Sequence, residues 1–430
     1  MMFSAFIKAC FNIFHFRVKG GVLQLTLGIG VIISVICAAM ILLVYLSNLH
    51  FLKQKLENDL SDNALSGIAY GMASRDQLNF NEVYSFDLFG EGIDSVDIIR
   101  KPWGMFEVLT AVAKRGSNEE LKAAIITAQP DDVGRSALYI PENNSPIYLV
   151  GETTLVGTAY LPERKFSMGY IDGQGYNKKS FIEGDVKGSE SVMPSLDTIL
   201  IAQTKAFFKE APDGYRVNRI DFLPVGQHLS FHGLPSNYYY SQQSIDLSDS
   251  ISGNIIIQSG IRVRVTSKAS LDNVIIIAPD IDIDNGFTGS VQCIAQRKIV
   301  IGSGAKLKYP SALLLAGEEN DSSIVIKKDA VVEGVVVISG YDKSIGSRGI
   351  LSIQKGAILH GMAYVNGRAD IQGAIWGHLA ARSVMAKIAS AEYASHLFNA
   401  EINSVKRSAF LPGSLLWAHT EEIKIAEWID

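Results

Sequence analysis

The longest uncharged stretch of the chain limits its architecture more than any other feature. Residues 23–46 read LQLTLGIGVIISVICAAMILLVYL and contain no charged side chain. At the rise of an α-helix this segment is roughly 36 Å long, which is enough to cross the hydrocarbon core of a bilayer. A secretory signal peptide has a shorter apolar region, of about 7–15 residues, followed by a cleavage site of small residues. The sequence therefore predicts one transmembrane helix.

The charges before this segment predict its orientation. Lys8, Arg17 and Lys19 precede the span, and residues 1–20 contain no acidic side chain. The positive-inside rule keeps such a leader in the cytoplasm and exports the chain that follows Leu46. The predicted location is therefore a single pass through the inner membrane, with a cytoplasmic N-terminus and the bulk of the chain in the periplasm or outside the cell.

Apolar residues continue at helical spacing after the span, which predicts a helix over 22–73. Charged residues lie between them, so the second part of this helix is amphipathic and is expected to act as a stalk. We assign residues 21–74 to this combined transmembrane and stalk helix. The apolar stripe consists of Leu49, Leu52, Leu56, Leu60, Ala64, Ile68 and Met72.

The junction between leader and span carries a resemblance to a known family. Lys19-Gly20, followed at once by the uncharged run from Gly21, resembles the start of type IV pilins and pseudopilins. The resemblance implies cleavage by a prepilin peptidase between Gly20 and Gly21, and a long helix that packs into a filament core. Leu25 stands where major pilins have a glutamate, as in some minor members found at filament tips. An uncleaved membrane anchor is the alternative.

Small residues on one face of the span suggest a surface for helix packing. Gly30, Ser34 and Ala38 recur every four residues. Small side chains at this spacing let helix backbones approach each other closely in lipid. Chance occurrence in a simple anchor is the alternative interpretation.

An internal repeat dominates the second half of the sequence. Its pattern is apolar-x-apolar-x-x-x-Ala-x-apolar, and its four copies begin 36, 25 and 27 residues apart. Alternating apolar residues with a small residue between strands, repeated at this period, indicate stacked parallel strands. The sequence predicts a parallel β-helix, with a β-sandwich as the alternative. The copies contain Val263, Val265, Ala269 and Leu271; Ile299, Ile301, Ala305 and Leu307; Ile324, Ile326, Ala330 and Val332; and Leu351, Ile353, Ala357 and Leu359.

The remaining segments are assigned around this repeat. Residues 147–161 fit an extended form of the template, so the β-helix is predicted over 147–380 with an insert at 162–250. Residues 75–146 are expected to form a small α+β unit in which NEELKAAIIT is helical. Residues 381–430 are expected to form a C-terminal cap that begins with a helix from Ala380 to His396.

One helix is also predicted within the insert, starting at the capping residue Ser195. The fold class is thus mainly β. The stretches at 354–367 and 371–377 resemble bactofilin-type polymer-forming repeats, and the order of the segments resembles membrane-anchored proteins of Bacteroidota.

Few residues point to chemistry. Asp280, Asp282 and Asp284 alternate along one strand, so their carboxylates share a face that is a weak candidate for Ca²⁺ or for acting on acidic polysaccharide. We identify no arginine or lysine pair at the repeat spacing beside them, and a solvated face is the simpler interpretation. His228 and His232 are four residues apart in a segment rich in proline and glycine, and the glutamate of a metalloprotease motif is missing.

Two further features complete the search for sites. Residues 238–240 are three consecutive tyrosines, which either stack on sugars, lie at a partner interface or, more simply, cover the repeat region. Cys10, Cys37 and Cys293 are too few and too far apart for a disulfide framework or a zinc site. No cofactor is expected.

Charge composition argues against a nucleic-acid partner. The chain has 39 Lys and Arg against 44 Asp and Glu, and no basic stripe follows the leader. Together these observations favour a non-enzymatic, membrane-anchored component of a type IV filament-like assembly, with other pilin-like or secretion subunits as partners. The alternative is an anchored β-helix that binds or cleaves envelope or extracellular polysaccharide.

Overall fold

The computed structural model describes residues 22–90, 92–197, 202, 206, 208, 217–232, 235–317, 322–340, 349–408, 413–415 and 420–429. Of the described residues, 52% lie in strands and 17% in helices, so the fold is mainly β, as the sequence predicts. By its internal contacts the chain divides into two compact units, Met1–Leu60 and Ser61–Asp430.

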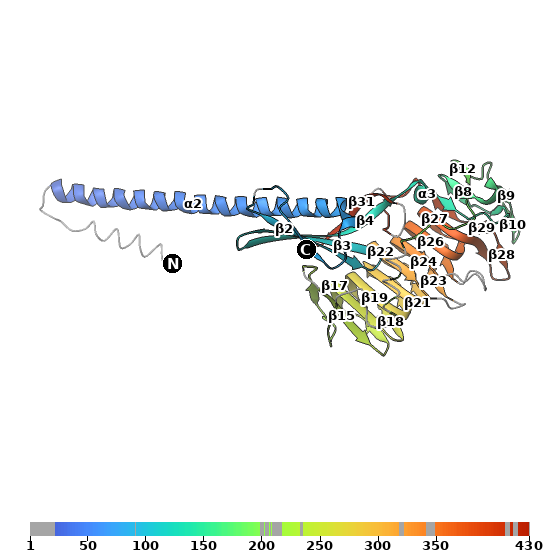
Figure 1. The fold of residues 1–430 in the computed structure, drawn as a ribbon. Helices are drawn as coiled ribbons and strands as arrows, with labels where there is room; N and C mark the ends of the chain where they lie inside the picture. Colours follow the sequence, from blue (N-terminus) through green and yellow to red (C-terminus); the bar gives the residue numbers. More distant parts are fainter. Residues whose placement is uncertain are drawn as a thin grey trace. The chain divides into compact units, whose positions relative to one another are not determined.

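One long helix, α2, begins at Val22 and ends at Ala73 (Figure 1). This confirms the helix predicted over 22–73, and the helix is long and apolar enough to span a membrane. Its side chains from Val22 to Lys55 are exposed, whereas Ala64 and Ile68 are buried. The predicted apolar stripe is therefore covered only in its second part.

An antiparallel sheet covers the last turns of α2, from residue 61 onward. Its strands in spatial order are β1 (Val83–Phe86), β2 (Ser95–Trp103), β3 (Phe106–Arg115), β4 (Asn118–Pro130) and β31 (Thr420–Ile429). The β2–β3 turn contains Gly104 and the β3–β4 turn contains Gly116, with φ values of 61° and 62° that favour glycine. A short 3₁₀-helix, η1 (Arg75–Gln77), links α2 to this sheet.

Two predictions for this region are wrong. The segment NEELKAAIIT forms strand β4 instead of a helix, because it pairs with β3 on one side and with β31 on the other. Its good helix formers are overridden by this double pairing, which buries the run from Ala123 to Ala128. The C-terminal cap is the second wrong prediction for these residues. Thr420–Ile429 form strand β31, which pairs with β4 as the edge strand of the antiparallel sheet and does not cap the repeat region.

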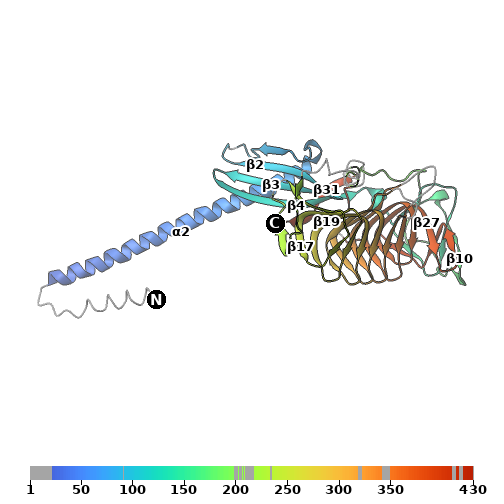
Figure 2. The same ribbon diagram turned by 90° about the horizontal axis from the view of Figure 1, so that it is seen from below.

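Three parallel ladders make up most of the second unit (Figure 2). In the first ladder, Val263, Ile281, Ile299, Ile324, Leu351 and Ala369 are paired in succession. The apolar positions of the sequence repeat therefore align in register, with one additional rung between the first two copies. The strands of this ladder are β16 (Ile245–Leu247), β18 (Arg262–Val265), β23 (Ser323–Ile326), β25 (Ile350–Ile353) and the final parts of β19 (Ser270–Ile283), β21 (Val291–Ile301) and β26 (Ile358–Ile371).

The other two ladders use the chain between these strands. One pairs Ile257, Ile276, Cys293, Leu313, Val336, Ala363 and Leu379 through neighbouring strands, and the other pairs Leu307, Val332, Leu359, Ile375 and Ile402. From Leu271 to Val384 the chain visits the three ladders in a constant order. The additional strands are β14 (Gln227–Leu229), β15 (Ser236–Ser241), β17 (Ser250–Ser259), β20 (Thr288–Gly289), β22 (Lys306–Leu315), β24 (Val331–Ile338) and β27 (Ala374–Lys387).

The ladders continue past β27 with strands that come earlier in the sequence. Strand β27 pairs with β5 (Leu138–Tyr139) and β30 (Glu401–Asn403), which pair in turn with β8 (Ala159–Leu161) and β7 (Thr154–Val156). Strand β12 (Val186–Gly188) follows β8. The repeat-like stretch at 147–161 thus lies beyond the last copy of the repeat, and does not precede the first.

Two boundaries of the prediction therefore need correction. The proposed insert at 162–250 contributes β12, β13 (Val217–Arg219), β14 and β15 to parallel pairs, so much of it belongs to the ladders. The helix predicted from Ala380 to His396 is wrong, because the residues up to Lys387 are the end of strand β27, which pairs with β26. The helix predicted from Ser195 lies largely outside the described residues.

Short elements complete the second unit. They are β6 (Ile147–Val150), β9 (Phe166–Met168), β10 (Tyr170–Ile171), β11 (Gln174–Gly175), β28 (Glu392–Ala394), β29 (His396–Phe398), α3 (Asp132–Arg135) and η2 (Pro162–Arg164). Strand β6 lies between β29 and β9 in a parallel sheet of three strands.

The core lies between the three ladders and is built from the inward residues of the repeat. Ala305, Ala330 and Ala357 are fully buried there, as the small repeat position predicts. Gly334 and Gly361 are paired and have φ values of 145° and 140°. A Cβ atom at Gly361 would overlap the carbonyl oxygen of Gly334, so this corner requires glycine.

Candidate functional site

The first candidate site is the exposed apolar part of α2. Its large side chains are among the most exposed of the described residues, with Val22 and Leu23 at 80%. Charged residues are absent from Leu23 to Leu46, so this part of the helix is apolar on every side. A helix of this kind requires lipid or other protein around it. The segment is therefore a candidate membrane or assembly surface.

The last turns of α2 are held closely on the antiparallel sheet. Gly67 faces β2 and β3 so closely that a Cβ atom there would lie 2.6 Å from Val96 Cγ1 and 2.9 Å from Ala111 Cβ. Gly71, one turn later, faces Ile98 and Leu109 with more space. The two glycines let the helix approach the sheet, which fixes the position of residues 61–73.

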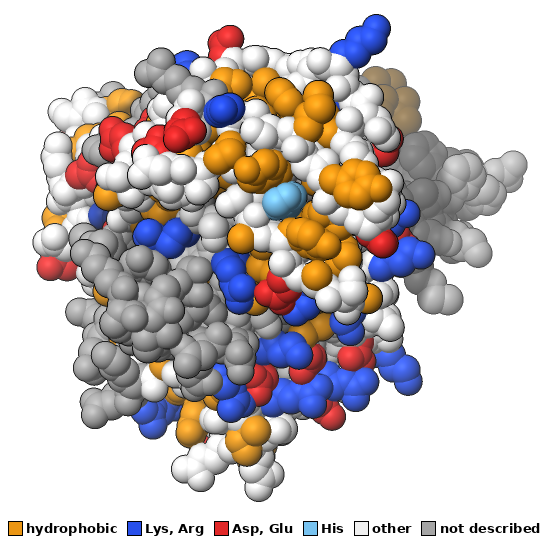
Figure 3. Space-filling view, turned by 90° about the vertical axis from the view of Figure 1, so that its right-hand side faces the viewer, with side chains coloured by type: hydrophobic (Ala, Val, Ile, Leu, Met, Phe, Trp, Pro, Cys, Tyr) orange, Lys and Arg blue, Asp and Glu red, His pale blue; other side chains and the backbone are white. Residues whose placement is uncertain are grey.

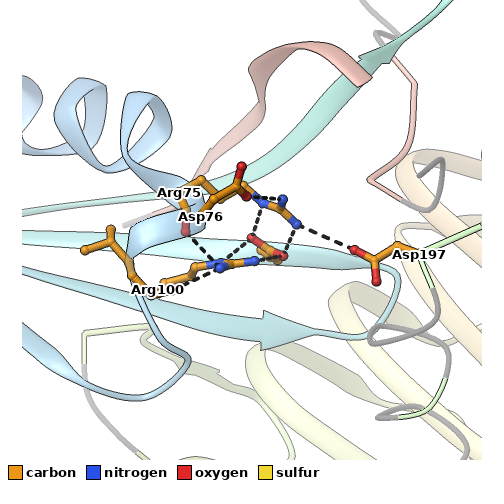
Figure 4. Close-up of polar contacts among 6 residues, drawn as sticks. Arg75, Asp76, Arg100 and Asp197 are labelled. Atoms are coloured by element: carbon orange, nitrogen blue, oxygen red, sulfur yellow. Dashed lines mark hydrogen bonds and ion pairs between the residues drawn. The ribbon is translucent and has the colours of Figure 1, made fainter. Parts of the chain in front are cut away.

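A buried ionic cluster anchors the residues that follow the helix (Figure 4). Arg75 donates from Nε and Nη2 to the two carboxylate oxygens of Glu107, at 2.9 and 2.6 Å. Arg100 donates to the same two oxygens at 2.8 and 2.7 Å. Arg75 also forms ion pairs with two aspartates. Its Nη2 lies 4.0 Å from Asp197 Oδ2, and its Nη1 lies 3.2 Å from Asp76 Oδ1.

The cluster joins three separate segments. Arg75 belongs to η1, Arg100 to β2 and Glu107 to β3, while Arg100 Nη1 also donates to the carbonyl oxygens of Arg75 and Leu78. Burial by itself would raise the pKa of Glu107, but hydrogen bonds and charges from the two arginines outweigh it and lower that pKa. Glu107 is therefore a carboxylate at neutral pH, and its hydrogen bonds hold Arg75 and Arg100 in position.

A second buried charge lies where the sheet meets the ladders. The side chain of Lys101 donates to the carbonyl oxygen of Phe231 at 3.0 Å, and burial lowers its pKa to about 8. Nearby, Gln292 of β21 accepts from the amide of Met105 at 2.7 Å and donates to the carbonyl oxygen of Trp103 at 3.0 Å. These contacts fasten the β2–β3 turn to the outer face of the ladders.

The three aspartates of the sequence analysis lie together, but each is paired with an arginine. Arg262 lies 2.7 Å from Asp282 and Arg264 lies 2.8 Å from Asp284, while Arg297 pairs with Asp280.

The expectation that no basic pair adjoins these aspartates is wrong. Arg262 and Arg264 lie on β18, and each is directly opposite an aspartate of β19 in the parallel register. These carboxylates are neutralised by cations, which favours an exposed ion-pair ladder over a Ca²⁺ site. Among the described residues, no group of three or more His, Cys, Asp or Glu side chains is placed to hold a metal ion.

The histidines and tyrosines of the sequence analysis are also dispersed. His228 is exposed beside Ser252, with 3.0 Å between its Nδ1 and the Oγ of Ser252. His232 is also exposed and lies three residues after the end of β14. Tyr238 is buried and donates to Gln258 at 2.8 Å, whereas Tyr240 is 47% exposed. Only Tyr240 of the three tyrosines has a largely free ring.

The proposed processing and packing residues belong to the first unit. Gly20 and Gly21 lie outside the described residues. Gly30, Ser34 and Ala38 are all on the exposed part of α2, and Ser34 donates to the carbonyl oxygen of Gly30 at 2.8 Å. Among the residues that the structure describes, none would lie within 4 Å of a Cβ atom at Gly30.

The ionic cluster was missed by sequence reasoning, although one signal was present. Arg100 and Glu107 interrupt the apolar run VDIIRKPWGMFEVLTAVA on either side of the glycine turn, where a hairpin brings opposite strands together. Their partner Arg75 carries no such signal.

No protein-family model, no curated protein and no solved structure matches this chain.

Proposed function

We propose that the chain is a non-enzymatic, membrane-anchored subunit of a type IV filament-like assembly. In this proposal α2 crosses the inner membrane once with the N-terminus in the cytoplasm. The residues from Ser61 onward form an exported head, and the three ladders of that head are a parallel β-helix.

The observation that carries the proposal is the change of character within one continuous helix. Residues 22–55 of α2 are exposed, and those from Leu23 to Leu46 are apolar on all sides, whereas Ala64 and Ile68 are buried against the sheet. A simple tether needs only a span and a flexible linker. Two glycines and a buried ionic cluster instead pack the last turns of the helix into the unit from Ser61 onward, which suits a subunit whose folded head continues directly from its helix.

The order of the strands supports a β-helix for the head. The chain visits the three ladders in a constant order, and each passage adds one strand to every ladder. Stacking of this kind buries a continuous core from units that are unstable alone. Figure 2 shows strands β17 to β27 following one another in a row.

Processing of the leader tests the filament part of the proposal. Intact-mass analysis of membrane-extracted protein should show a chain that begins at Gly21 in a strain with an active prepilin peptidase. The same chain should keep its leader when the peptidase gene is deleted, and the Gly20→Leu variant should keep it in both strains. A chain that retains Met1 beside an active peptidase would refute membership of this class.

Membrane topology is tested separately with single cysteines. In a variant whose three native cysteines are replaced by serine, Lys328→Cys should react with an impermeant maleimide added to spheroplasts, because this side chain is 71% exposed. Ser4→Cys in the leader should react only after lysis. The reverse pattern would show the opposite orientation.

A further inference from the structure

A groove lies beside the end of α2, on the face of the antiparallel sheet that carries this helix. Its volume is about 470 Å³, and the end of α2 forms one wall while the start of β31 forms the other. Ala69 and Ala73 are exposed in this groove, and Met72 and Ile423 are half-buried. We call it the β31 groove. Its other lining residues are Arg75, Asp76 and Glu422.

Strand β31 continues the apolar surface of this groove. Trp428 lies opposite Ala124 of β4, Ala124 lies opposite Leu109 of β3, and Leu109 faces α2. Residues that lie directly opposite on antiparallel strands share a face, so Trp428 is on the α2 side of the sheet. Ile423 and Ile425 share this face, because their β4 partners are four and two residues from Ala124. Trp428 is 50% exposed and both isoleucines are half-buried.

The polar side chains of the groove favour a basic partner. The guanidinium of Arg75 donates to both carboxylate oxygens of the buried Glu107. The side chains of Asp76 and Glu422 are 92% and 63% exposed, and they pair with Arg75 and Lys424 at 3.2 Å. Exposed ion pairs of this kind contribute little to stability, so both carboxylates can accept a lysine of a partner. An apolar groove with carboxylates at its rim fits an amphipathic helix that has basic residues beside its apolar stripe.

The stalk part of α2 has this complementary pattern. Leu49, Leu52 and Leu56 lie on one side of the helix, and we call them the stalk stripe. Leu49 and Leu52 are 45% and 61% exposed, and Leu56 is half-buried. Lys53 and Lys55 are exposed and lie within one turn of Leu52. The chain thus carries both an acidic apolar groove and an exposed apolar stripe with lysines beside it.

We propose that the β31 groove of one copy binds the stalk stripe of a second copy. One wall of the groove and the stalk stripe belong to the same helix, so the stripe that enters a groove comes from another chain. Leu52 of one copy then lies level with Ala69 of the other, which displaces the two copies by 17 residues, or roughly 26 Å, along the helix axis. The two contact surfaces differ, so the contact repeats from copy to copy in one direction. This inference names the partner of the proposed filament subunit and rests on that function.

Cross-linking between two differently tagged full-length copies tests this contact. Both copies have their native cysteines replaced by serine, one carries Leu52→Cys and the other carries Ile423→Cys. They are co-expressed in the native strain and treated with bismaleimidohexane. The cross-linked pair of tags should be at least tenfold more abundant than when Phe51→Cys takes the place of Leu52→Cys. Phe51 is 64% exposed but lies on the other side of the helix from the stalk stripe, so it controls for random encounters.

Two charge variants separate the stripe from the rest of the stalk. Leu49→Glu, added to the copy with Leu52→Cys, should lower the cross-linked yield at least fivefold, because it places a carboxylate in an apolar groove that already carries two. Gln54→Glu adds the same charge on the other side of the helix and should leave the yield unchanged.

The outcomes for the contact and for the proposed function are distinguishable. Equal yields from Leu52→Cys and Phe51→Cys would overturn the contact, and so would a cross-link within a single chain that carries both Leu52→Cys and Ile423→Cys. Intact-mass analysis of the same samples reports on filament membership separately. A chain that begins at Gly21 without the cross-linked pair refutes the contact alone. A chain that keeps Met1 beside an active peptidase refutes filament membership, and the cross-linked yield decides the contact in either case.

Discussion

The contact between α2 and the sheet yields the sharpest prediction, because two glycines one turn apart differ in the space around them. Replacing glycine by alanine inside a helix favours folding by about 1 kcal/mol through helix propensity. The same change costs about 1–3 kcal/mol where the added methyl group overpacks the core. Which effect dominates depends on the atoms that face each glycine.

At Gly67 the overpacking cost should dominate. The added methyl carbon would lie 2.6 Å from Val96 Cγ1 and 2.9 Å from Ala111 Cβ, both inside the usual carbon–carbon separation of about 3.5–4.0 Å. Val96 can change its rotamer, but the Cβ of Ala111 is fixed to its backbone, so the helix must move away from the sheet. Because the Ala111 contact cannot relax, we expect an overpacking cost of about 2–3 kcal/mol, which leaves Gly67→Ala less stable by about 1–2 kcal/mol after the propensity gain.

At Gly71 the two effects should nearly cancel. The added carbon would lie 3.2 Å from Ile98 Cγ2 and 3.3 Å from Leu109 Cδ1, which are ends of side chains that can shift by a few tenths of an ångström. Gly71→Ala should therefore change the free energy of unfolding by about 0.5 kcal/mol or less, in either direction.

Thermal unfolding of both variants in the same detergent measures the difference. The midpoint of Gly67→Ala should lie about 2 °C or more below that of the wild type, and that of Gly71→Ala within about 1 °C of it. Equal midpoints for the two variants, or a rise for Gly67→Ala, would show that the helix does not lie on the sheet as closely as described.

Three further predictions concern buried groups. Glu107→Gln should destabilise by about 3–5 kcal/mol, because it leaves two buried arginines without a carboxylate. Since the pKa of Glu107 is lowered from its ordinary 4.5, the wild type should lose this stability as the pH falls below that value, and urea titrations at pH 3.5 and 7 should show a smaller difference in the variant. Lys101 has a pKa of about 8 in the folded protein and 10.5 in the unfolded chain. Between pH 8 and 10.5 the folded state therefore binds fewer protons, so wild-type stability should rise with pH by up to about 3 kcal/mol across that range. Lys101→Met should remove this rise, and a midpoint that still climbs equally between pH 7.5 and 10 would assign it to other groups. Ala330→Phe should cost about 1–3 kcal/mol or more because this position is fully buried between the ladders, whereas the exposed Lys328→Ala should leave the melting curve unchanged.

Charged surfaces of the head also need the structure for their interpretation. The face in Figure 3 gathers apolar side chains in its middle and mixed basic and acidic side chains along its lower edge. Alternating aspartates at Asp280, Asp282 and Asp284 are visible in the sequence, but their arginine partners lie 17 to 20 residues away on other strands. A pattern that suggests a cation site in one strand becomes an ion-pair ladder once the neighbouring strands are placed.

Local patterns in the sequence determined two large features of this protein. The uncharged run followed by an amphipathic stripe specifies the helix from Val22 to Ala73, because helical periodicity is a property of neighbouring residues. The apolar repeat specifies the register in which Ile299, Ile324 and Leu351 pair, because each copy places its inward residues at the same offset. In each of these two features, the residues that form the pattern are close neighbours along the chain.

Only the tertiary structure decided where distant segments meet. Strand β4 has a helix-like composition, and its state is set by pairing with β31, which is almost 300 residues later. The stretch at 147–161 joins the far end of the ladders through β30, and β5 and β8 continue the ladder past β27 although they come more than 200 residues earlier in the sequence. Long-range strand pairing depends on which exposed edges are available after the rest of the chain has folded, and no local periodicity records that availability.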